Sequence, residues 1–324
     1  MKFPRLALLL FVTALAAWIA SALYASFVDP EMKFWTAAAR QKLSWVEKMR
    51  QKHGYVIGVV GGSTTTFGID AEHIEREHGL PVANLGLHVG MGPEACIGFG
   101  LSALHKGDTL VLSLEPSAFT EDYPEESKLG SKLALLLGHP EIVGWDSQSK
   151  GIEVIKSLIA LPPGGYHVMS MLGKLALRMP LYRYGIENLR PGGLQVTEDR
   201  RDFAKFTDYS NSSELLELSR EGREFLFQVN QEASKRGIQV FYLLPWAYWP
   251  MDGAKERRAA NAILLNDIAL VVPVIHEPAL GVNSELRDFA DSGQHLTKEA
   301  ASRRSDCLAK ALSSAGHQPP DSQN

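Results

Sequence analysis

The sequence predicts an α/β fold, a doubly wound parallel sheet of about five strands. Short apolar runs alternate with longer helical patterns, and Gly or Pro residues separate most of these segments. This alternation is typical of right-handed βαβ units, whose helices cover both faces of a parallel sheet. Functional sites of such sheets lie beyond the carboxyl ends of the strands. We also expect a helical insert and an N-terminal transmembrane helix.

The N-terminal apolar segment runs from Leu6 to about Val28, after the basic residues Lys2 and Arg5. About twenty apolar residues suffice to cross a bilayer, and the basic flank favours a cytoplasmic N-terminus. We therefore expect residues 1–28 to anchor the chain in the inner (cytoplasmic) membrane, with the remainder periplasmic or otherwise extracytoplasmic. The alternative is a cleaved secretory signal, because Ala20-Ser21-Ala22 resembles a cleavage site; the protein would then be secreted.

Three further parts follow the anchor. Residues 29–52 have a helical pattern with several Lys and Arg, which we expect to form a stalk with a solvated face. The α/β domain is expected at 53–314. Within it, from about 117 to 211, the alternation fails and Pro-Gly breaks recur, which predicts an inserted subdomain or lid. The polar tail, 315–324, has a composition typical of disorder.

The elements of the α/β domain are expected in a regular order. The strand-like runs lie at 55–61, 81–84, 109–114, 238–244 and 271–276. The helical patterns lie at 69–78, 94–105, 213–236, 254–270 and 297–313.

Composition argues against several classes of function. The chain has 324 residues and a formal net charge of -4, without a basic run, so we expect no nucleic acid partner. The turn Gly58 to Ser63 lacks both the G-x-G-x-x-G order and a P-loop lysine, which argues against a nucleotide cofactor. Cys96 and Cys307 fit no zinc or redox spacing, and we favour two unpaired thiols over the disulfide that an oxidising compartment would permit. We expect neither a cofactor nor a metal.

The candidate nucleophile is Ser63, in Gly61-Gly62-Ser63-Thr64 at the end of the first expected strand. The glycines let the backbone bend where the strand becomes a helix, so that the hydroxyl is presented at the turn. Asp291 and His295 lie far along the chain, just before the last expected helix. A nucleophile and its base meet in this way in α/β folds. The sequence therefore predicts a serine esterase or acyltransferase.

The order and context of these residues resemble the SGNH (GDSL-like) hydrolase superfamily, and within it a membrane-anchored, envelope-associated bacterial branch. The similar blocks are Gly61-Gly62-Ser63, then Asn84, Gly86 and Gly90, then Asp291 with His295. The similarity covers about residues 55–115 and 214–312. It implies an SGNH/flavodoxin-like arrangement of the sheet.

The resemblance also implies a mechanism. Ser63 would attack an ester carbonyl, His295 would take its proton, and Asp291 would orient the imidazole. Backbone N–H groups of Ser63 and Gly90 would donate to the oxyanion, each worth about 3 kcal/mol. The residues expected at the oxyanion or the substrate are Gly62, Asn84, Gly86, His88, Gly90 and Glu115.

Two departures from the family pattern stand out. Glu115 follows the third expected strand, near the place where the family has an Asn that donates to the oxyanion. A carboxylate there would repel an oxyanion unless it were protonated or pointed away, and we expect it to position a loop or a substrate hydroxyl. Asp291 lies four residues before His295 instead of three. Asp288 is the poorer alternative partner.

The implied reaction is hydrolysis or transfer of a small acyl group, such as acetyl, on an envelope polysaccharide or glycolipid. The expected partners are therefore an acyl-bearing glycan or lipid-linked substrate and, for a transferase, a membrane-embedded acyl donor. A lid that excludes water would favour transfer. The alternative is a non-catalytic module that uses the SGNH scaffold to bind glycan or a partner in an envelope polysaccharide export or assembly complex. The missing Asn favours this alternative, whereas the joint presence of Ser63, Asp291 and His295 favours an enzyme.

Overall fold

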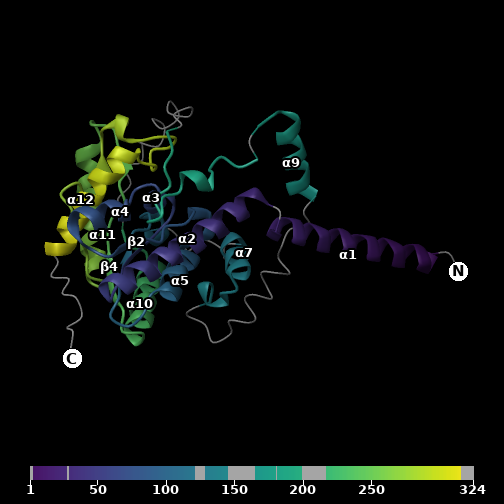
Figure 1. The fold of residues 1–324 in the computed structure, drawn as a ribbon, viewed down its shortest axis with the longest axis horizontal. Coiled ribbons are helices and arrows are strands. Elements are labelled where there is room, and N and C mark those ends of the chain that lie inside the picture. Colours follow the sequence, from purple (N-terminus) through teal and green to yellow (C-terminus); the bar gives the residue numbers. More distant parts are fainter. Residues whose placement is uncertain are drawn as a thin grey trace.

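The computed structural model describes residues 3–27, 29–120, 128–144, 165–179, 181–198 and 217–314. Its centre is a parallel sheet of four strands in the order β2-β1-β3-β4 (Figure 1). The strands are β1 (Ile57–Val60), β2 (Val82–Asn84), β3 (Thr109–Leu112) and β4 (Gln239–Tyr242). A mixed α/β fold with a parallel sheet is thus confirmed. The strand order reverses between β1 and β3, and ligands of open α/β sheets bind at such a reversal.

The expected fifth strand, 271–276, is reduced to an isolated bridge between Tyr242 and Val274. The Tyr242 N–H donates to Pro273 (2.8 Å), and the Ile275 N–H donates back to Tyr242 (2.8 Å). Pro273 has no N–H and cannot extend a ladder of hydrogen bonds. The expected count of about five strands is therefore corrected to four in this sheet. A separate pair of short strands, β5 (Ala247–Tyr248) and β6 (Val282–Asn283), lies farther along the chain.

Alternate strand residues point to opposite sides of the four-stranded sheet. Both faces are apolar, and helices cover each of them. On one face, Val59 and Val111 share a core with Ile74 and Leu308. The helices on that face are α4 (Ala71–His78) and α12 (Lys298–Ser314). The other face carries the larger core. Its helices include α2 (Pro30–His53), α5 (Pro93–Ala103), α10 (Arg220–Lys235) and α11 (Ala254–Ala269).

Helix α2 is the segment that we expect to form a stalk, yet one of its faces lies in this larger core. The Asp29 side chain caps its first turn by accepting from the Glu31 N–H (3.0 Å). Trp35 is fully buried, and Trp45 donates its indole N–H to the Val82 carbonyl at the edge of the sheet (2.9 Å). The segment carries basic residues, which favour a solvated stalk, but it also has an apolar face at helical spacing, and that face is buried. The helix is therefore part of the α/β domain.

Lys42 lies on the buried face of α2 and is fully enclosed. Its Nζ donates to the backbone carbonyls of Asn84 (3.0 Å) and Gly193 (2.7 Å). It therefore joins α2 to the end of β2 and to the end of the insert. Burial disfavours the charged ammonium and lowers the pKa of Lys42 to about 7.

The described parts of the insert contain short helices joined by irregular segments. The helices are α6 (Ser117–Thr120), α7 (Lys128–Leu137), η2 (Pro140–Ile142), α9 (Gly165–Ala176) and η3 (Ile186–Asn188). Helix α7 packs into the larger core through Leu133 and Ala134. Part of the expected lid, and the tail 315–324, lie outside the described residues.

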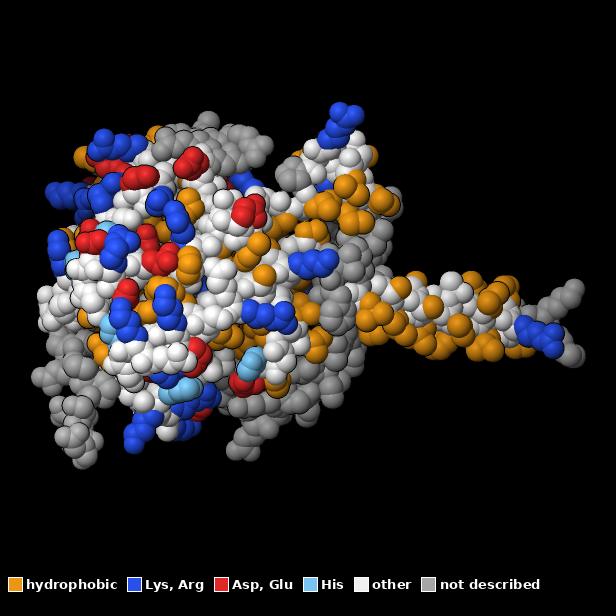
Figure 2. All heavy atoms as spheres, viewed as in Figure 1, with side chains coloured by type: hydrophobic (Ala, Val, Ile, Leu, Met, Phe, Trp, Pro, Cys, Tyr) orange, Lys and Arg blue, Asp and Glu red, His pale blue; other side chains and the backbone are white. Residues whose placement is uncertain are grey.

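Helix α1 (Phe3–Phe27) points away from the α/β domain in Figure 1, and Figure 2 shows apolar side chains along it. Leu10 and Phe11 are 62% and 65% exposed. Over the residues that the structure describes, no helix is both long and apolar enough to pass through a membrane. The expected transmembrane helix is thus not supported by the fold.

Cys96 and Cys307 are both free thiols.

The burial of Lys42 gives a prediction for the variant Lys42→Met, which keeps an apolar stem and removes the amine. The unfolded lysine binds more protons than the folded one between pH 7 and about 10.5, because its folded pKa lies below its ordinary value. The free energy of unfolding of the wild type should therefore rise with pH across this window, relative to the variant. The rise is at most about 1.4 kcal/mol per pH unit. Urea titrations at pH 7 and pH 9 measure it, and an identical pH dependence in both proteins would contradict the buried amine.

Candidate active site

The first part of the site is the turn between β1 and α3 (Ser63–Thr66). A side chain at Gly61 would meet the Ser113 carbonyl and the Thr65 hydroxyl, so only glycine fits there. Thr65 Oγ1 donates to the Ser113 carbonyl (2.9 Å), which fixes the turn beside β3. Ser63 is the first residue of the helix and is 6% exposed. The turn thus holds Ser63 at the carboxyl end of β1, at the reversal of strand order.

Glu115, just beyond β3, lies against the start of α3. Its Oε1 accepts from the Thr64 hydroxyl (2.7 Å). A Cβ at Gly62 would lie 2.8 Å from the same oxygen, so glycine at the N-cap leaves room for the carboxyl. Burial raises the pKa of Glu115 and outweighs the opposing hydrogen bonds from Thr64 and from its own backbone N–H. Glu115 therefore takes the place of a capping side chain, and its environment favours the neutral acid.

The second part of the site is the loop before α12. His295 Nδ1 lies 2.7 Å from Asp291 Oδ1. The Ala290 N–H donates to the His295 carbonyl (2.8 Å), which closes the loop and accommodates the four-residue spacing. The expected alternative, Asp288, instead accepts from Asn283 (2.9 Å) and pairs with Arg303. Asp291 is therefore the carboxylate that orients the imidazole.

Two residues of the insert also contact this carboxylate. Tyr184 Oη donates to Asp291 Oδ2 (2.8 Å), and Arg183 Nη1 lies 3.3 Å from the same oxygen. Burial alone would raise the pKa of Asp291. The hydrogen bond and charge of His295, followed by Tyr184 and Arg183, outweigh burial and lower it. Asp291 is thus an ionised, oriented partner for the histidine.

An aromatic stack joins the two parts of the site. The rings of Phe67 and His295 are 4.0 Å apart between centroids and nearly parallel, at 16°. Phe67 follows α3 directly, and its N–H donates to the Ser63 carbonyl (2.9 Å). The residue on which the imidazole stacks therefore follows Ser63 by one helical turn of backbone. Ser63 and His295 make no direct hydrogen bond in this arrangement; such bonds often tighten only when substrate binds.

Asn84 does not face the reacting groups. Its side chain is fully buried, and Nδ2 donates to the carbonyls of Thr65 (2.8 Å) and Ile69 (2.8 Å). Its Oδ1 accepts from the Gly86 N–H (3.0 Å). A Cβ at Gly86 would come within 2.5 Å of the Thr66 N atom. Asn84 and Gly86 therefore hold the α3 turn from behind and are not placed to donate to an oxyanion.

His88 and Gly90 bond to each other. The Gly90 N–H donates to His88 Nδ1 (2.9 Å), so the N–H expected at the oxyanion is engaged here. Because Nδ1 accepts, a neutral His88 carries its proton on Nε2. Burial, followed by the charge of His295, lowers the pKa of His88. Burial thus favours the neutral imidazole of His88, and His295 adds an electrostatic interaction in the same direction.

Neither a protein-family model nor a curated protein sequence matches this chain. The functional argument therefore depends on the geometry of the site. Sequence reasoning selected Ser63, Asp291 and His295 but missed Phe67, Arg183 and Tyr184. The run Tyr182-Arg183-Tyr184, aromatic and basic within a segment broken by Pro and Gly, is the signal that would have drawn attention to the last two.

The environment of Glu115 predicts the behaviour of Glu115→Gln, which mimics the neutral acid. The folded pKa of Glu115 lies above its ordinary value of 4.5, so its contribution to stability is present below pH 4.5 and is lost as pH rises through the folded pKa. Gln does not titrate, so the stability of the variant relative to the wild type should grow as pH rises above 4.5. Urea titrations at pH 4.5, 6 and 7.5 measure the difference. A variant that becomes relatively less stable with rising pH would show that the carboxylate form supports the turn.

Proposed function

We propose that this protein is an SGNH-like serine esterase or O-acyltransferase. The observation that carries the proposal is the pair of His295 and Asp291 at 2.7 Å, with His295 stacked on the aromatic residue that follows the Ser63 helix. The three residue types have the roles of nucleophile, base and orienting carboxylate. The three residues come from distant segments near the carboxyl ends of the strands, where the sites of such sheets lie, and this supports their use in one site.

In the proposed reaction, Ser63 Oγ attacks the ester carbonyl and gives its proton to His295 Nε2, while Asp291 holds Nδ1–H. The Ser63 backbone N–H, at the first position of α3, lacks an intrahelical acceptor and is suited to the oxyanion. His295 then protonates the leaving alcohol, which leaves an acyl-serine. Water releases the acyl group in an esterase, and a sugar hydroxyl accepts it in a transferase.

The proposed substrate is an acyl ester, such as an acetyl ester, of an envelope polysaccharide or glycolipid. This choice follows from the resemblance of the Ser63, Asn84 and His295 blocks to envelope-associated SGNH proteins. We propose an extracytoplasmic α/β domain, held to the inner membrane by α1, whose described apolar side chains from Leu6 to Leu23 are largely exposed. A membrane-embedded partner would supply the acyl group if the protein is a transferase.

One observation favours a second candidate, a non-catalytic glycan-binding or partner-binding module on the same scaffold. The Gly90 N–H is bonded to His88, and Asn84 is bonded to the α3 turn. Two groups expected near an oxyanion are therefore engaged. A scaffold that only binds would tolerate this loss, whereas an enzyme needs donors from Ser63 and from a group that becomes free with substrate.

A fluorophosphonate probe tests the nucleophile in the full chain. The probe should label the wild type, and Ser63→Ala should abolish the labelling. His295→Ala should slow labelling by about 10³-fold or more, because the base is lost. Ser102→Ala, a partly buried serine on α5, is the matched control and should label like the wild type. A folded wild type that is not labelled, and whose glycan binding is unchanged in His295→Ala, would favour the non-catalytic module.

Membrane attachment is tested separately, by alkaline extraction and N-terminal sequencing of the expressed full chain. The chain should stay in the membrane pellet with its N-terminal segment intact, because α1 exposes apolar side chains that water disfavours. Leu9→Arg together with Phe11→Arg should move it toward the soluble fraction. A soluble wild-type chain that begins after Ala22 would identify a cleaved signal instead.

A further inference from the structure

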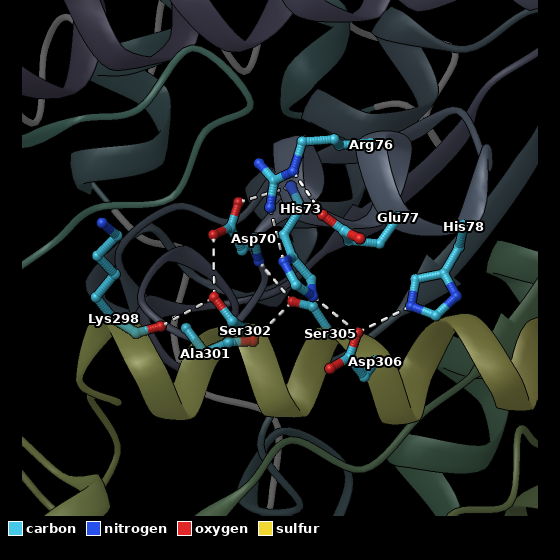
Figure 3. A network of polar contacts seen from close by, with 10 residues as sticks. All are labelled: Asp70, His73, Arg76, Glu77, His78, Lys298, Ala301, Ser302, Ser305 and Asp306. Atoms are coloured by element: carbon cyan, nitrogen blue, oxygen red, sulfur yellow. Dashed lines mark hydrogen bonds and ion pairs between the residues drawn. The ribbon is translucent and has the colours of Figure 1, made fainter.

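A second cluster of histidine and carboxylate side chains lies outside the candidate active site, where α4 packs on α12 (Figure 3). His73 Nε2 lies 2.7 Å from Asp306 Oδ1, and His78 Nε2 lies 2.8 Å from the same oxygen. Two ring nitrogens of α4 thus converge on one carboxylate of α12. The ligand atoms of the three residues lie within 4.8 Å of one another.

We propose that His73, His78 and Asp306 bind a zinc-type divalent metal ion that ties α4 to α12. Two imidazole nitrogens and one carboxylate oxygen suit zinc and its neighbours in the transition series, whereas Mg²⁺ and Ca²⁺ prefer oxygen alone. Ligands around tetrahedral zinc are separated by about 3.3 Å, given bonds of about 2.0 Å. The three side chains reach this geometry by small rotations, and water completes the coordination.

The helices that carry these ligands are already fixed to each other. Asp70, which caps the start of α4, donates its backbone N–H to Ser305 Oγ on α12 (2.7 Å). Figure 3 shows this contact beside the cluster, next to Ser302 and Asp306 on the same helix. The ligands therefore sit on a rigid frame, and only their side chains need to move. A frame of this kind favours metal binding because little order has to be created.

Arg76 decides whether the site is open to a metal. Its Nη2 lies 3.1 Å from His73 Nδ1. A guanidinium only donates, so Nδ1 accepts and the His73 proton lies on Nε2, facing Asp306. A metal at Nε2 needs that lone pair, so Arg76 must withdraw and the proton must move to Nδ1. The Arg76 side chain is 63% exposed and also pairs with Glu77 at the surface, so it is able to leave.

Calorimetric titration of the detergent-solubilised full chain with ZnCl₂ tests the site. The wild type should bind one zinc ion per chain, and zinc should raise its melting temperature. His78→Ala and Asp306→Asn should each weaken binding at least about tenfold. Arg76→Gln should strengthen binding, because it frees His73 Nδ1. His139→Ala is the matched control, since His139 also bonds a carboxylate, Glu141 (2.8 Å), but does not belong to the three-residue cluster.

Circular dichroism checks the fold of each variant, and His78→Gln replaces His78→Ala if the alanine variant unfolds. The proposal is overturned if the wild type does not bind zinc, if binding survives both His78→Ala and Asp306→Asn, or if Arg76→Gln weakens it. General adsorption of zinc to surface histidines would make His139→Ala as damaging as His78→Ala, which also overturns it. None of these measurements uses the ester reaction, so they are independent of the role of Ser63.

Discussion

The hydrogen bonds of the buried Asn84 side chain are the interaction on which the rest of the candidate site depends. The side chain is fully buried at the end of β2, donates to the carbonyls of Thr65 within α3 and of Ile69 beyond it, and accepts from the Gly86 N–H. Lys42 adds a bond to the Asn84 carbonyl from α2. Replacing this amide would destabilise the fold, because each buried carbonyl left without a hydrogen-bond donor costs about 1–3 kcal/mol of folding free energy. The segment that carries Ser63 is therefore held from behind by a buried amide.

The sequence predicted the mixed α/β fold because that fold depends on local patterns. The hydrophobic periodicity of a segment predicts whether it is a strand or a helix, and the carboxyl ends of parallel strands lie at one edge of the sheet. The apolar run at 271–276 predicts a fifth strand. Pro273 within it lacks the N–H that would extend the ladder, so only an isolated bridge forms. The embedded position of α2 was hidden by its basic residues.

The role of Tyr184 was beyond prediction for a different reason. Its hydroxyl reaches Asp291 across the fold, from an insert that has no regular alternation. Likewise, whether Asn84 faces an oxyanion or a backbone carbonyl is a matter of side-chain direction, which spacing along the chain does not encode. Residue type and order thus selected a candidate site, whereas the hydrogen bonds around its side chains come from tertiary contacts. Glu115 lies between these cases, since its place after β3 was evident and its contact with Thr64 was not.

Glu115 also limits what chemistry the site can perform. An ionised carboxyl at the start of α3 would oppose negative charge on an oxyanion held by the Ser63 N–H. Burial raises the pKa of Glu115 and so favours the neutral acid, which removes that opposition. Glu115 Oε1 accepts from the Thr64 hydroxyl, and a carboxyl oxygen accepts in the neutral acid as well as in the carboxylate. In the reaction proposed for Ser63, Glu115 therefore opposes the oxyanion less as a neutral acid than as a carboxylate.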